Sequence, residues 1–182
     1  SYPKGQYVEH ARFYAGRSLF ENTTDARLDQ SNTLLAMEEF QNFLDYYPNT
    51  VLKAQTQEMI FALQDKLVQK EYNAAKLYYD LGAYVGNCTF GGSNYEACIV
   101  TAENALRDYP YASASRREEF GIMILRAKYH LAVQSVEDKK MDRYREAIDE
   151  YYGFVNEYPE SKYLAEARRM LVSAEKVVKN SK

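Results

Sequence analysis

Three stretches with a common ending decide how this chain folds: Asp45–Thr50 (DYYPNT), Arg107–Ala112 (RDYPYA) and Asn156–Ser161 (NEYPES). Each contains a Tyr-Pro pair, and a fourth pair, Tyr2-Pro3, stands near the start. Proline lacks a backbone N–H and pushes the preceding residue out of helical geometry. Each Tyr-Pro pair therefore predicts the end of a helix.

The residues before each internal proline share one pattern. At offsets −12, −8, −5, −4 and −1 they are apolar or aromatic, and these offsets lie on one face of a helix with 3.6 residues per turn. The pattern predicts one amphipathic helix, ended by Tyr-Pro and copied along the chain. Its members are Ala36, Phe40, Phe43 and Leu44; Cys98, Ala102, Ala105 and Leu106; and Ala147, Tyr151, Phe154 and Val155.

A small residue at −12 followed by an aromatic residue at −8 is typical of the second helix of a tetratricopeptide repeat. Tyr78-x₂-Leu81-Gly82 matches the first helix of that repeat. The fold predicted is all-α, a tetratricopeptide-like α-solenoid of about three irregular helix pairs plus a C-terminal capping helix. We expect a single domain over residues 1–182, with units at about 5–48, 50–110 and 114–159 and the cap at 160–180.

Two helices show how the pairs should stack. The segment Phe120–Val136 is apolar on two sides, which predicts a helix sandwiched between neighbours. The last helix has one apolar stripe, through Leu164, Ala167, Leu171 and Ala174, and a polar outer face that includes Glu166, Arg169, Ser173, Lys176 and Lys179. Within the pairs we expect Ala36, Cys98 and Ala147 to be buried.

The composition excludes several classes of protein. The net charge of −3 gives no footprint for nucleic acid, and no run of 18 apolar residues could span a membrane. The charge is uneven, because residues 139–182 carry 10 Lys/Arg and 8 Asp/Glu while residues 1–138 carry 13 and 18. No signal peptide is visible, and Tyr2-Pro3 would end a missing earlier unit, so we expect the chain to be a fragment.

The residues that could carry chemistry do not combine into a site. His10 and His130 have no Cys, Asp or Ser at a metal or triad spacing, so both are expected to be ordinary helix-surface histidines. Cys88 and Cys98 are predicted to be unpaired thiols. The glycine-rich segment 86–94 lacks the motifs of a phosphate-binding loop. We therefore predict no enzyme activity, no catalytic residues, no cofactor and no metal.

Four arginines near the C-terminus are the candidate partner-binding residues: Arg143, Arg145, Arg168 and Arg169. They lie where the charge balance turns positive. Guanidinium groups can grip the carboxylates of an acidic partner surface. The alternative is an ordinary solvated helix face.

An ordered set of segments resembles a known family. RLDQSNTLLAMEEFQNFLDYYPNT (residues 27–50), AAKLYYDLGAYVGN (74–87), NALRDYP (104–110) and the segment 116–167 resemble the outer membrane protein assembly factor BamD family, in particular versions from Bacteroides-like bacteria. The resemblance covers nearly all of residues 1–175. The segment 87–94 departs from it as extra loop length.

The resemblance implies a non-enzymatic scaffold subunit of the machinery that assembles β-barrel proteins in the outer membrane. It implies a protein at the periplasmic face of the outer membrane, held only by a lipid anchor that this chain does not contain. The partners implied are the periplasmic domains of the barrel subunit BamA, on which the C-terminal repeats dock, and unfolded outer-membrane proteins as substrates. The alternative is a generic tetratricopeptide adaptor that binds peptide tails in its concave groove.

Overall fold

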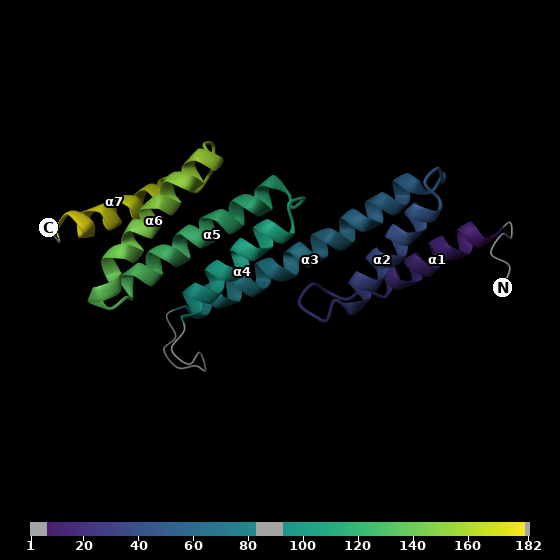
Figure 1. Cartoon of the computed structure of the whole chain (residues 1–182), viewed down its shortest axis with the longest axis horizontal. Coiled ribbons are helices and arrows are strands. Elements are labelled where there is room, and N and C mark those ends of the chain that lie inside the picture. The colour runs from purple at the N-terminus through teal and green to yellow at the C-terminus, as the bar shows by residue number, and fades with distance from the viewer. Residues whose placement is uncertain (1–6, 83–92, 181–182) are drawn as a thin grey trace. The chain divides into compact units, whose positions relative to one another are not determined.

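The computed structural model describes residues 7–82 and 93–180, and within these ranges the chain is entirely helical. Neighbouring helices pack in pairs, which confirms the predicted all-α class and its likeness to a tetratricopeptide α-solenoid (Figure 1). The helices found in the described ranges are α1 (Val8–Glu21), α2 (Ser31–Tyr46), α3 (Lys53–Leu81), α4 (Asn94–Asp108), α5 (Ala114–Val133), α6 (Glu137–Glu157) and α7 (Leu164–Asn180).

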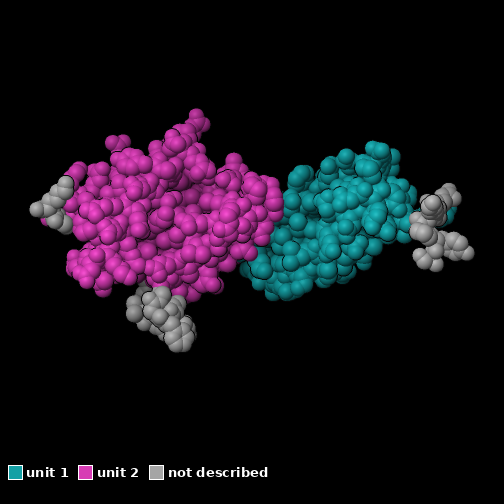
Figure 2. Space-filling view, viewed as in Figure 1, with its two compact units in different colours: residues 1–70 teal, residues 71–182 magenta. Residues whose placement is uncertain are grey.

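The chain divides into two compact units, residues 1–70 and 71–182 (Figure 2). The first unit holds α1, α2 and the N-terminal part of α3. The second holds the C-terminal part of α3 and the helices α4 to α7. The repeat boundaries near residues 48, 110 and 159 stay a prediction.

The three internal Tyr-Pro turns share one backbone geometry. The tyrosines that follow α2, α4 and α6 have φ/ψ of −128/64°, −121/65° and −126/66°. In each, the tyrosine N–H donates to the carbonyl four residues earlier, the final helical hydrogen bond before the proline. The pre-proline residue is thus held just outside the helical region, as expected from steric conflict with the proline ring. The residues concerned are Tyr47, Tyr109 and Tyr158.

The predicted helix face forms the core. All positions at offsets −12 and −5 are buried, including Ala36, Cys98 and Ala147. In the first unit, Phe40 and Phe43 pack with Phe13 and Leu63. The residues at offset −4 and Tyr151 are only partly buried, so they lie at the edge of the buried face.

Helix α5 is sandwiched as predicted, since it packs against α4, α6 and α7. Its two apolar stripes are buried from Phe120 to Ala132 except at Tyr129, which is partly buried. The expectation was wrong at one end. The helix stops at Val133, and Val136 is 68% exposed because it precedes α6 rather than continuing the stripe.

A close approach recurs at the far end of two helix pairs. A Cβ on Gly82 would lie 2.1 Å from the ring of Tyr95, so only glycine fits there. At the corresponding place in the last pair, buried Ala132 packs with Tyr144 and with Ala174 of α7. Tyr95 and Tyr144 both stand fifteen residues before a turn proline, at Pro110 and Pro159. Position −15 is therefore a tyrosine in two of the three units, whereas the first unit has Thr33 there.

Helix α7 caps the second unit through Ala167 and Ala174, both fully buried. Its outer face is less polar than expected. Glu166, which the sequence placed on that face, turns instead toward α5. Val172 takes a place on the surface and is 59% exposed.

Candidate partner-binding surface

The position of α7 is fixed by an ion pair to α5. Arg126 donates from Nε and Nη2 to the two carboxylate oxygens of Glu166, both at 2.6 Å. These hydrogen bonds lower the pKa of the Glu166 carboxyl and raise the pKa of Arg126. Nearby, the hydroxyl of Tyr129 donates to Ser173 at 2.9 Å. The two links hold one side of α7 against α5, so the opposite side is presented as a defined surface.

The exposed surface of α7 carries two of the predicted arginines, and Arg169 lies one turn after Glu166 on the same side of the helix. Arg168 and Arg169 are exposed and form no ion pair with any residue of the described ranges. Together with Ala165 and Val172 they line a shallow hollow of about 440 Å³. These four residues repeat at helical spacing along α7. The surface therefore offers two guanidinium groups beside an apolar depression, and we call it the α7 outer face.

The other two predicted arginines are engaged within the chain. Arg143 donates from Nη1 to Ser135 at 2.6 Å and from Nη2 to Glu96 of α4 at 2.5 Å. Its side chain is 22% exposed. Arg145 is well exposed but pairs with Asp142 one turn earlier, at 2.8 Å. Such an exposed pair stabilises a helix only weakly.

The structure does not gather the four arginines into one cluster. Arg143 and Arg145 flank Tyr144, which packs against Ala174 near the C-terminal end of α7. Arg168 and Arg169 directly follow Ala167, which packs against Phe154. Ten residues of α6 separate Tyr144 from Phe154, which is about 15 Å along a helix. The α7 outer face therefore rests on Arg168 and Arg169. A partner-binding role for Arg143 and Arg145 stays a prediction.

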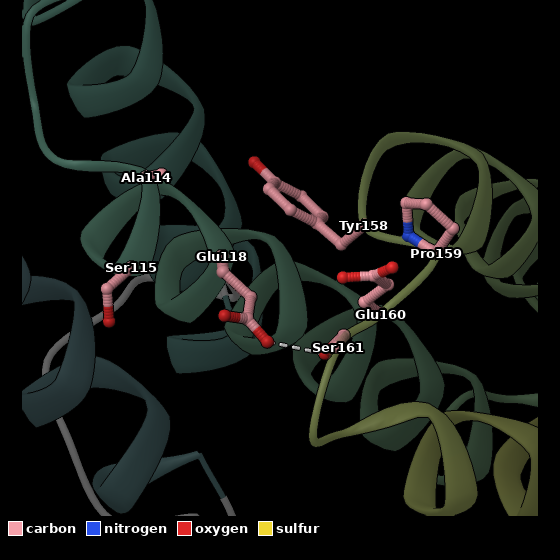
Figure 3. Close-up of a pocket in the computed structure, with 7 residues that line it drawn as sticks. All are labelled: Ala114, Ser115, Glu118, Tyr158, Pro159, Glu160 and Ser161. Carbon is pink, nitrogen blue, oxygen red and sulfur yellow. Dashed lines mark hydrogen bonds between the residues drawn. The ribbon is translucent and has the colours of Figure 1, made fainter.

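A second hollow lies under the last Tyr-Pro turn, with a volume of about 370 Å³. Figure 3 shows Glu118 from α5 and Tyr158, Glu160 and Ser161 from the turn around it. The hydroxyl of Ser161 donates to Glu118 at 2.5 Å and accepts the N–H of Tyr163 at 3.0 Å. We call this the 158–161 hollow. Sequence reasoning treated the turn only as a helix stop and missed it.

The two histidines differ in their surroundings. His10 is exposed on α1, as expected. His130 is not an ordinary surface residue, because its ring stacks on Tyr95 at 5.5 Å and 18° and lies 6.0 Å from Tyr79. Burial, with a smaller contribution from Arg126, lowers the pKa of His130. The sequence signal for this aromatic cluster is a tyrosine on each of three successive helices: Tyr79 of α3, Tyr95 of α4 and Tyr129 of α5.

Cys98 is buried, as its repeat position predicted, and burial raises the pKa of its thiol to about 12. Its predicted lack of a bond to Cys88 lies outside the described residues. In the part of the chain described, no group of three or more His, Cys, Asp or Glu side chains could hold a metal ion. Over the same residues, no helix has the length and apolarity that crossing a membrane requires.

A comparison with protein-family models adds information from outside the chain. Residues 1–89 match the YfiO family, described as outer membrane lipoprotein. The match covers 89 of the 182 residues, including all of α1, α2 and α3. It supports the resemblance to the BamD family noted in the sequence. The resemblance to Bacteroides-like versions and the expected truncation stay predictions.

Proposed function

We propose that the whole chain belongs to this lipoprotein family and serves as a non-enzymatic scaffold in outer-membrane β-barrel assembly. The family match over residues 1–89 is the observation that carries the proposal. The resemblance of residues 104–110 and 116–167 extends the same assignment to the second unit. The protein would act at the periplasmic face of the outer membrane, held there by a lipid anchor on the full-length protein.

The C-terminal unit would dock on the periplasmic domains of the barrel subunit BamA through the α7 outer face. Neither Arg168 nor Arg169 makes a hydrogen bond or an ion pair within the described residues, although the charge of Arg169 helps to lower the pKa of the Glu166 carboxyl, so their donors are available to carboxylates. The apolar floor of the hollow, with Val172 exposed, can take an apolar side chain of the partner. Because α7 is already fixed by the Arg126–Glu166 and Tyr129–Ser173 contacts, docking on a partner costs little further conformational entropy. Unfolded outer-membrane proteins would be the substrates of the assembled machine.

Binding to the purified periplasmic domains of the barrel subunit, measured by calorimetry at two salt concentrations, tests this proposal. We expect the double variant Arg168→Glu/Arg169→Glu to weaken binding at least tenfold with little change in melting temperature. The wild-type affinity should fall with salt, because charges at the rim of an interface are screened over about 8 Å at physiological ionic strength.

The matched control reverses two exposed lysines of the first unit, Lys53 and Lys70. Lys66, on the same helix as Lys53, is not used as a control because its ammonium donates to Thr23 at 2.6 Å and supports the fold. Equal losses in the two double variants would show a general charge effect and contradict docking at α7. Undiminished binding by the arginine variant would move the contact elsewhere, for example to the concave groove of the alternative adaptor function.

A further inference from the structure

The 158–161 hollow has the parts of a binding site for a positively charged side chain. Two carboxylates line it, Glu118 from the second turn of α5 and Glu160 from the turn after α6. Figure 3 shows both side chains bordering the same space, with the ring of Tyr158 and Pro159 beside them. Lysine and arginine do not line this hollow, so nothing within its lining neutralises the two carboxylates.

The basic side chains around the hollow already have interactions within the chain. Arg116 binds Glu119 at 2.6 Å, and Arg117 lies 3.7 Å from Glu157. Lys162 rests over the ring of Tyr163, 5.0 Å from its centre, and makes no ion pair within the described residues. A hydrogen bond to Tyr163, with smaller contributions from the charges of Glu118 and Glu119, raises the pKa of Lys162. Among the described residues, Glu118 accepts a hydrogen bond from the hydroxyl of Ser161 alone, through one of its two carboxylate oxygens. The second oxygen of Glu118 and the carboxylate of Glu160 are left for an external cation.

The aromatic wall of the hollow is held in place. The hydroxyl of Tyr158 donates to Glu157 at 2.8 Å, and burial together with this hydrogen bond raises the pKa of Tyr158 to about 12. Its ring packs on Phe154 at 5.2 Å. Elsewhere in the described chain arginine or lysine lies over the rings of Tyr46, Tyr72 and Tyr163. Arg117 interacts with the hydroxyl of Tyr158, but no cation of the described chain lies over the face of that ring. A fixed aromatic ring beside carboxylates favours a cation with an apolar stem.

The same construction occurs in the first unit. A hollow of about 360 Å³ lies under the turn after α2 and is lined by Glu9, Tyr47, Pro48 and Thr50, among others. The hydroxyl of Thr50 donates to Glu9, as that of Ser161 does to Glu118. The turn after α4 departs from this scheme, because buried Ala112 stands where the other two have a hydroxyl. The tyrosine has the same backbone geometry in all three turns, but after α4 the hydroxyl that caps the next helix is that of Ser113, one residue later. The hydroxyl–glutamate link is therefore not needed to end the helix.

We propose that the 158–161 hollow binds a lysine or arginine side chain of a partner polypeptide. The cation lies between Glu118 and Glu160, and its methylene stem packs against Tyr158 and Pro159. This site is distinct from the α7 outer face, which favours acidic partners, and it does not depend on the proposed function. The first-unit hollow, with the single carboxylate of Glu9, binds the same class of ligand more weakly.

Chemical-shift mapping on the full chain tests the proposal. The probes are the blocked peptides acetyl-Gly-Arg-Gly-amide, acetyl-Gly-Lys-Gly-amide and acetyl-Gly-Gln-Gly-amide, with putrescine as a free diamine. We expect saturable shifts of the backbone amides of Ser115, Glu118 and Ser161 with the two basic peptides, and none with the glutamine peptide. Equal shifts with the glutamine peptide would overturn the charge recognition. Equal saturation by putrescine would overturn the polypeptide as the source of the cation.

Variants then locate the site. The double variant Glu118→Gln/Glu160→Gln should weaken the arginine peptide at least tenfold, while the amide oxygen at position 118 still accepts from Ser161. Glu119→Gln is the matched control, since it removes one negative charge from the next position without touching the hollow. It should change affinity less than twofold. Unchanged binding by the double variant would refute the site, and so would an equal loss with Glu119→Gln, which would indicate only a long-range field.

Discussion

Replacing Glu166 with glutamine tests how α7 is held against α5. The change keeps the size of the side chain but removes the charge that accepts two hydrogen bonds of 2.6 Å from Arg126. A hydrogen bond to a charged group contributes about 1.5–3 kcal/mol when buried, and an exposed ion pair contributes about 0–1 kcal/mol. The two side chains are 27% and 35% exposed, which places this pair between those limits. We expect a loss of about 1–2 kcal/mol in the free energy of unfolding.

The pH dependence gives a second, independent signature. The pKa of Glu166 is lowered in the folded chain by its hydrogen bonds to Arg126. Its contribution is therefore fully present above the unfolded pKa of about 4.3 and is lost as the pH falls through the folded value. The difference in stability between wild type and Glu166→Gln should be constant near neutral pH and should shrink below about pH 4.

Urea unfolding followed by circular dichroism, at several pH values, measures both effects. Glu175→Gln is the control on the same helix, because Glu175 pairs only with Lys179, whose side chain is 75% exposed. That variant should change stability by less than about 0.5 kcal/mol. If Glu166→Gln were as mild as the control, or if its deficit persisted unchanged at low pH, the ion pair would not be what fixes α7.

Two further substitutions test the packing between helices. Ala147→Leu should overpack the contact between α5 and α6 and lower the free energy of unfolding by about 1–3 kcal/mol. Ala54→Leu, on the exposed side of α3, is the control and should leave the melting temperature nearly unchanged. Equal effects of the two changes would contradict the repeat register. Gly82→Ala brings a Cβ to 2.1 Å from the ring of Tyr95 and should lower the free energy of unfolding by about 2–3 kcal/mol. Gly153→Ala, whose Cβ would meet nothing within 4 Å, should raise it by about 0.5–1 kcal/mol in the same thermal unfolding assay. A Gly82→Ala variant as stable as the wild type would show that Tyr95 can move aside.

The helices could be predicted because local and global signals agree. A proline ends a helix wherever it falls, and the small residue at −12 is buried whenever a second helix must approach closely. The burial of Ala36, Cys98 and Ala147 therefore followed from spacing alone. The end of α5 did not, since valine suits either a helix stripe or the extended residue before the next helix, as at Val136.

The surface residues could not be placed with the same certainty. A charged residue on an amphipathic helix can face water or reach across to a neighbouring helix, and the helical wheel does not distinguish the two near the boundary. Glu166 adjoins Ala167 of the buried stripe, and the partner that draws it inward, Arg126, lies 40 residues away in the sequence. Arg143 is similar, because Glu96 lies 47 residues earlier. Such pairs depend on how helices are stacked, which no local pattern contains.

The turns show where a structural repeat can acquire a second use. The tyrosine before the proline has the same φ and ψ in all three turns, so the stop signal requires only tyrosine and proline. Two of them also carry a hydroxyl bound to a glutamate, Glu9 of α1 or Glu118 of α5, one helix before the helix that ends at the turn; the third has Ala112 at the place of the hydroxyl. A feature that the fold tolerates losing in one copy is not fixed by the fold in the others. At the last turn this feature combines with Glu160, an acidic residue that lines the same hollow and makes no hydrogen bond or ion pair within the described residues. The carboxylates there are better explained by a cation brought by a partner than by the needs of helix packing.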